Sequence, residues 1–170
     1  LIINNKEISS NQPTYIIAEI GINHNGSFDL AIKMVEAAAY GGVDAVKVQI
    51  ITAAKSYAKT SPSYEIFKNV EFSPDQWQKL VEKATSLNID VFSTFVNIDD
   101  LHYVEKLNLP AIKISSTNVT NFPLLKAISQ LNKPVIMSTG MAYLSEVDEA
   151  VRFLEEKGVS QMGILQCSAL

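Results

Sequence analysis

The chain has 170 residues, of which 47% are hydrophobic and 19% charged, and its formal net charge is −4. This composition is ordinary for a globular domain, and no basic run follows a nucleic-acid backbone, so we expect no nucleic-acid partner. The apolar stretches are short and interrupted by Lys, Glu or Gly, so we expect no membrane span. The single cysteine, Cys167, excludes an internal disulfide and suits a cytoplasmic location.

Short runs rich in Ile, Val and Phe alternate with longer amphipathic stretches. The runs are almost continuously apolar, which is typical of parallel strands buried on both faces. They predict strands at 15–20, 45–50, 90–94, 111–114, 135–138 and 162–166. The stretches between them predict helices at 27–41, 74–88, 98–107, 122–131 and 145–157. Ser27 is placed to cap the first helix, and Ser73 with Gln76 has the spacing of a capping box. Residues 52–71 read as a long irregular loop, a feature that is often functional.

This alternation is compatible with an open doubly wound sheet or with a closed barrel. The glycines after the first strand, Gly21 and Gly26, lack the spacing of a dinucleotide fingerprint, which favours the barrel. A barrel of this kind needs eight strand–helix units. We therefore interpret residues 1–170 as the N-terminal part of a single α/β domain, a (β/α)8 TIM barrel truncated after the sixth strand.

Every predicted strand carries a polar residue at its C-terminal end, and in a barrel these ends form the catalytic rim. A hydroxyl at such a place also occurs simply because the chain meets water there. Lys47 and Lys113 are more informative, because they lie within apolar runs and a buried lysine is costly without an anionic partner. Gln49 shares a strand face with Lys47, and Glu19 is either a site residue or a structural counter-ion. The lysines and hydroxyls together predict a site for a small phosphorylated acid.

Residues 16–49, IIAEIGINHNGSFDLAIKMVEAAAYGGVDAVKVQ, resemble the opening of the N-acetylneuraminate (sialic acid) synthase family. The resemblance continues in register with FSTF at 92–95, AIKISSTNVTNFPLL at 111–125, KPVIMSTGM at 133–141 and ILQCS at 164–168. It therefore covers essentially the whole chain. The wider group includes legionaminic and pseudaminic acid synthases and spore-coat polysaccharide proteins.

The resemblance implies an enzyme that condenses phosphoenolpyruvate with N-acetylmannosamine or a modified N-acetylhexosamine, giving a nine-carbon 2-keto sugar acid and phosphate. It assigns Glu19 to the reacting centre, Gln49 to a sugar-facing position, and His24 to the border of the sugar site or the ordering of its loop. The residues that match the phosphoenolpyruvate site are Lys47, Thr94, Lys113, Ser116 and Ser138.

The resemblance also implies a divalent ion, Mn²⁺ or Mg²⁺, which polarises the sugar aldehyde as a Lewis acid. Its two histidine ligands would come after Leu170, so we expect no metal ligand in this fragment. A C-terminal antifreeze-like domain would also follow Leu170, and in a homodimer it would complete the partner's sugar site. We expect the 170 residues alone to be inactive, because they lack the metal ligands and leave the barrel open.

The chain departs from the family pattern at four positions, one of which is Ser168 in place of a threonine. The acid that follows the KIxS motif, a candidate for activating the attacking water, is Asn118 here, and an amide cannot take up that proton. Gln166 stands in place of a histidine, and Ala169 in place of an asparagine that contacts the sugar. These changes favour a modified acceptor sugar.

Two other functions fit the residues. A Schiff-base aldolase would use Lys113 as its nucleophile, and a non-catalytic paralogue would bind the sugar without turnover. Cys167, at the end of the sixth strand, reads as a small buried packing residue rather than as a nucleophile.

Overall fold

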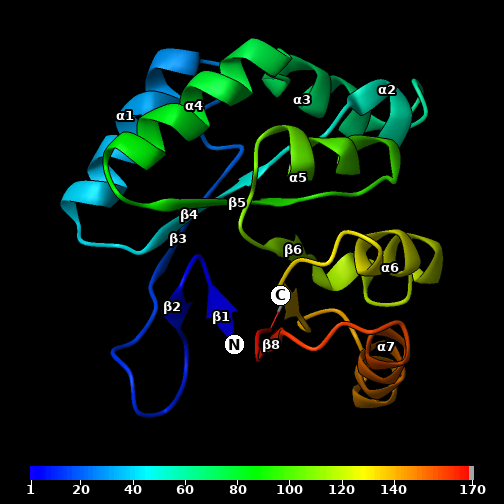
Figure 1. The fold of residues 1–170 in the computed structure, drawn as a ribbon. Helices are drawn as coiled ribbons and strands as arrows, with labels where there is room; N and C mark the ends of the chain where they lie inside the picture. The colour runs from blue at the N-terminus through cyan, green and yellow to red at the C-terminus, as the bar shows by residue number, and fades with distance from the viewer. Residues whose placement is uncertain (169–170) are drawn as a thin grey trace.

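The computed structural model describes residues 1–168 and contains six parallel strands that curl into part of a barrel (Figure 1). The order along the sheet is the order along the chain, without reversal. A doubly wound sheet reverses its strand order, so this topology confirms the truncated barrel. The strands are β3 (Ile17–Gly21), β4 (Ala45–Gln49), β5 (Asp90–Thr94), β6 (Ile112–Ile114), β7 (Val135–Ser138) and β8 (Met162–Leu165).

The five predicted helices are present, with ends that differ by one to a few residues. The first two are capped as predicted: the Ser27 side chain accepts a hydrogen bond from the Leu30 amide, and Ser73 and Gln76 form a capping box. None of the helices within residues 1–168 is long and apolar enough to cross a membrane. The helices are α1 (Phe28–Tyr40), α4 (Pro74–Ser86), α5 (His102–Lys106) after the 3-10 turn η1 (Asp99–Leu101), α6 (Phe122–Ser129) after η2 (Ser116–Asn118), and α7 (Leu144–Glu156).

The prediction of an irregular loop over 52–71 was wrong. This segment forms two short helices, α2 (Ala53–Ser56) and α3 (Pro62–Val70). Ser61 caps α3, and Pro62 occupies its first turn, which is a common helix start. α3 contains no fully buried residue, and its Phe67 ring stacks on Tyr57 with 4.9 Å between the ring centroids.

A two-stranded hairpin precedes the barrel, and the sequence did not predict it. Its strands β1 (Ile2–Ile3) and β2 (Lys6–Glu7) are too short to show a period of two. Asn4 and Asn5 form the turn with φ of 46° and 66°, the left-handed conformation that asparagine tolerates best after glycine.

The strands separate two apolar clusters. Residues that point outward, among them Val46, Val48 and Ile112, pack in one large cluster with the helices. Residues that point inward at the start of the strands, among them Ala45 and Phe92, form a smaller cluster with Ile3 of the hairpin. The hairpin therefore closes the N-terminal end of the strands, and the other end is left for polar side chains.

Candidate functional site

An open cleft of about 270 Å³ lies at the C-terminal ends of the strands. Larger hollows occur elsewhere, including one of about 550 Å³ at the opposite end of the barrel beside Asn4 and Asp90. The cleft at the C-terminal ends is the one that gathers the predicted polar residues. It is lined by Glu19, Lys47, Gln49, Thr94, Lys113, Ser115, Ser116, Ser138, Gly140, Cys167 and Ser168.

Strand geometry explains why these residues meet. Lys47 and Gln49 are two apart on β4, so both project to the inner face. In the register of the sheet, Glu19 lies opposite Lys47, and Thr94 lies opposite both Gln49 and Lys113. From β4 to β7, inward side chains nearer the strand starts are apolar, such as Ala45 and Ile136, and those nearer the ends are polar, such as Lys47 and Ser138.

Lys47 is buried but paired. Its Nζ lies 2.7 Å from Oε2 of Glu19, and the lysine side chain is 8% exposed while that of the glutamate is 56% exposed. The counter-ion interpretation of Glu19 therefore describes this structure. The carboxylate remains on the solvent side of the pair, where a ligand could meet it.

Lys113 is equally buried, at 6% exposure, but it forms none of the ion pairs found within residues 1–168. Its ammonium donates hydrogen bonds to the hydroxyl of Ser138 and, at 3.4 Å, to the carbonyl of Ile114. Burial lowers the pKa of Lys113, and the Glu19 carboxylate opposes this effect while the charge of Lys47 adds to it. A buried cation held by neutral acceptors favours an anionic ligand at this place.

Cys167 corrects a sequence-based prediction. We expected a buried packing residue, but the thiol is exposed and lines the cleft. The backbone N–H of Thr139, 3.3 Å from Sγ, is the main cause that lowers the pKa of Cys167, and Ser138 and Lys113 lower it further. The cleft therefore favours negative charge on the thiol as well.

Two predicted site residues lie apart from the cleft lining. His24 is 1% exposed and its ring packs against Phe72, with 4.3 Å between the ring centroids. Its Nδ1 accepts a hydrogen bond from the Gly26 amide at 3.2 Å, so it orders its own loop. Burial lowers the pKa of His24, which favours the neutral ring.

Asn118 is also buried, in η2. Its amide group donates a hydrogen bond to Ser115 at 3.0 Å and accepts one from Asn121 at 3.1 Å. Both hydrogen bonds order the turn after β6 and leave the side chain outside the cleft lining.

The sequence places Ser115 and Ser168 among the polar residues at the strand ends without giving them a role, and both line the cleft. Gly140, which also lines it, was missed, although it lies only two residues after the end of β7. Gln166, which replaces a histidine of the family pattern, is exposed and lines a second hollow next to the cleft. Ala169 lies outside the described residues.

Comparison with known proteins decides the family. The model of the NeuB family matches residues 34–170. This chain belongs to the NeuB family. It is 38% identical over 165 residues to an uncharacterised protein of Methanocaldococcus jannaschii, covering 97% of this chain and 49% of the relative. It is 35% identical over 171 residues to the N,N'-diacetyllegionaminic acid synthase of Campylobacter jejuni, covering 91% of this chain and 51% of the relative.

A solved structure supports the same assignment. The sialic acid synthetase of Leptospira borgpetersenii, crystallised with citrate, superposes with a TM-score of 0.93 at 29% identity. The match covers 100% of this NeuB chain and 59% of that structure. The chain spans about half the length of the curated relatives it matches.

Proposed function

We propose that this protein, in its intact form, condenses phosphoenolpyruvate with an N-acetylated hexosamine to give a nine-carbon 2-keto sugar acid and phosphate. The observation that carries the proposal is the pair of buried lysines in one cleft, only one of which has a carboxylate partner. Relatives named as sialic, legionaminic and pseudaminic acid synthases support the reaction class.

The cleft suits the charge of phosphoenolpyruvate. Lys113 supplies the cation that lacks a carboxylate partner, and Lys47 adds a second. Short hydroxyl donors surround them at Thr94, Ser116 and Ser138. Phosphate and carboxylate groups are bound well by such a combination of ammonium charge and hydroxyl donors. We propose that these five side chains hold phosphoenolpyruvate, with Gln49 facing the sugar and His24 ordering the adjacent loop.

The methylene carbon of phosphoenolpyruvate forms a bond to the aldehyde carbon of the open-chain sugar, whose C=O π bond breaks as its oxygen takes up a proton. Water adds to the former enol carbon and gives up a proton. Phosphate then leaves as the bond between that carbon and the phosphate oxygen breaks. Glu19 is the acid that lines the cleft, and an anionic substrate at Lys47 would compete for its ion pair. We propose that the released carboxylate accepts the proton of the attacking water.

Asn118 is less suited to this proton transfer. An amide does not take up a proton at neutral pH, and the Asn118 side chain is hydrogen-bonded to Ser115 and Asn121 outside the cleft lining. We propose that it orders the turn that carries Ser115 and Ser116.

The divalent ion expected from the resemblance stays a prediction. Residues 1–168 contain no group of three or more His, Cys, Asp or Glu side chains that could hold an ion. We propose that the ligands of Mn²⁺ or Mg²⁺ lie beyond Leu170. The homodimer, the cytoplasmic location and the inactivity of the isolated 170 residues also stay predictions.

The experiment is to incubate the intact protein with phosphoenolpyruvate, Mn²⁺ and a panel of N-acetylhexosamines. We expect phosphate release that depends on one acceptor and is accompanied by a 2-keto acid. Binding of phosphoenolpyruvate without phosphate release, for every acceptor, would contradict the synthase and support the non-catalytic paralogue.

A Schiff-base aldolase remains the second candidate because burial lowers the pKa of Lys113, and a neutral amine is the form that attacks a carbonyl. Borohydride added with a carbonyl substrate would then trap a covalent adduct on Lys113. The synthase predicts no adduct by mass spectrometry.

A further inference from the structure

Asp100 is a fully buried carboxylate, at 0% exposure, in the turn after β5. It takes part in none of the ion pairs found within residues 1–168. Its oxygens instead accept hydrogen bonds from the Thr52 amide at 2.8 Å, the Thr52 hydroxyl at 2.7 Å and the Asn97 side-chain amide at 2.7 Å. Burying a carboxylate without a cation is costly, so these three donors must hold a defined geometry for it to persist.

The hydrogen-bond donors to Asp100 come from the two segments that follow the neighbouring strands β4 and β5. Thr52 follows Gln49, the last residue of β4, by three positions, and Asn97 follows Thr94, the last residue of β5, by three. Both Gln49 and Thr94 line the cleft. Asp100 therefore joins the two segments that leave the cleft at adjacent strands.

Further hydrogen bonds support the same junction. The Asn97 side chain donates to the Ser56 hydroxyl at 2.7 Å and accepts from the Asp100 amide at 2.8 Å. Within β5 itself, the Ser93 hydroxyl accepts a hydrogen bond from the Ile50 amide at 2.9 Å. Residues 50–56 thus form hydrogen bonds with three side chains from the β5 segment, those of Ser93, Asn97 and Asp100.

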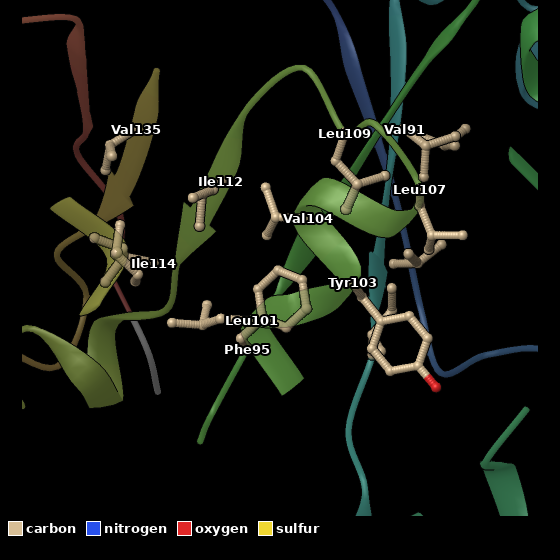
Figure 2. Packing of buried hydrophobic residues seen from close by; sticks show 14 of the residues in the cluster. Val91, Phe95, Leu101, Tyr103, Val104, Leu107, Leu109, Ile112, Ile114 and Val135 are labelled. Atoms are coloured by element: carbon tan, nitrogen blue, oxygen red, sulfur yellow. The ribbon is translucent and has the colours of Figure 1, made fainter. Parts of the chain in front are cut away.

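The turn that carries Asp100 is itself anchored by apolar packing. Leu101 and Val104, which follow it, are buried in the main core cluster together with Ile112 and Ile114 of β6 (Figure 2). A carboxylate on a rigid turn holds its hydrogen-bond donors in a narrower range of positions than one on a mobile loop, because the rigid turn has fewer alternative conformations.

We propose that Asp100 is a positioning residue that holds the exit of β4, and with it Gln49, for recognition of the acceptor sugar. The inference rests on the proposed function. It predicts a selective effect, because Gln49 ends β4 only three residues before Thr52. Lys47 lies two residues further into that strand, and Lys113 and Ser138 lie on β6 and β7. Losing Asp100 should weaken use of the sugar more than use of phosphoenolpyruvate.

The test uses the intact protein and the variants Asp100→Ala and Asp100→Asn. Asp100→Ala removes the acceptors of both Thr52 donors and should raise KM for the acceptor about tenfold, with KM for phosphoenolpyruvate within about twofold of wild type. Asp100→Asn should rescue the acceptor KM. Its carbonyl can accept from the Thr52 amide, and its NH2 can donate to the Thr52 hydroxyl, which is able to accept.

Two matched controls separate positioning from general stability. Asp90→Ala removes a carboxylate that also receives two side-chain hydrogen bonds, from Asn4 and Tyr15, but at the opposite end of β5. Glu105→Ala removes an exposed carboxylate from α5, the helix that follows the same turn. Neither should change the ratio of the two KM values. Equal changes of both KM values in Asp100→Ala, or the same ratio change in Asp90→Ala, would overturn the proposal.

Hydrogen exchange distinguishes failure of this inference from failure of the proposed function. Asp100→Ala should speed exchange of the Thr52 amide and leave the β7 amides unchanged. Unchanged exchange at Thr52 would contradict the role of Asp100 whatever the activity. A wild-type protein that releases no phosphate would contradict the proposed function instead.

Discussion

At the N-terminal ends of the strands, the β1–β2 hairpin covers an apolar layer in which Ile3 is fully buried. At the C-terminal ends, the same strands present Lys47, Lys113 and the surrounding hydroxyls to an open cleft. A hydrogen-bonded carboxylate lies near each end of β5: Asp90 accepts from Asn4 of the hairpin turn and from Tyr15, and Asp100, in the turn after β5, accepts from Thr52. One sheet thus has an apolar end that stabilises the fold and an end that forms the candidate site, as in other barrels of this type.

Among the variants that test this contrast between the two ends of the sheet, Lys113→Met should have the largest effect. The substitution removes the buried cation without opening a cavity, so the fold should persist and its unfolding temperature should not fall. Phosphate release should fall by about three orders of magnitude, the range expected when a charged group at the reacting substrate is lost.

The control is Lys79→Met, which removes a lysine exposed on α4. It should leave phosphate release unchanged. An active Lys113→Met protein would show that the cleft at the C-terminal ends is not the site.

The next effect belongs to the opposite end. Ile3→Ala should lower the free energy of unfolding by about 3 kcal/mol, because it leaves a cavity beneath the barrel. KM for both substrates should stay unchanged when measured well below the unfolding temperature. Ile2→Ala is the matched control, because Ile2 is 52% exposed. Chemical denaturation of both variants measures the difference, and similar losses would contradict the role of Ile3 as the closing residue.

Cys167 reports on the occupancy of the cleft. Because its pKa is lowered, the rate of alkylation by iodoacetamide should rise with pH and reach half of its maximum below the ordinary thiol value of about 8.5. Saturating phosphoenolpyruvate should slow the reaction about tenfold if it lies beside Lys113. Mass spectrometry of the peptide that contains Cys167 measures the rate. Equal rates with and without phosphoenolpyruvate would place that ligand elsewhere.

The smallest effect is expected from Tyr15→Phe. The Tyr15 hydroxyl donates a hydrogen bond to Asp90 at 2.7 Å, and burial followed by the Asp90 carboxylate raises the pKa of Tyr15. Loss of the hydroxyl should cost about 1 kcal/mol of unfolding free energy and leave activity unchanged. Tyr40→Phe, at a side chain that is 96% exposed, should cost nothing measurable by thermal unfolding. A change in KM for Tyr15→Phe would show that the two ends are coupled.

Much of the fold was predictable because buried parallel strands and amphipathic helices leave strong local patterns. Helix α1 and strand β5 were placed almost to the residue. The hairpin and α2 were missed because elements of two to four residues carry no usable period. Contacts from elsewhere in the chain hold them: Ile3 is buried with Phe92, and the Ala53 amide donates a hydrogen bond to Glu71.

For the site, the sequence was enough to predict that Lys47 and Lys113 are buried and face the same rim, because each lies inside an apolar strand. Their partners could be read only from the fold. The fold pairs Glu19 with Lys47 and places the Ser138 hydroxyl against Lys113. It exposes Cys167 in the cleft and leaves His24 and Asn118 outside the cleft lining. Residue type and strand period fix the face on which a side chain lies, but its partners depend on the register and exits of neighbouring strands.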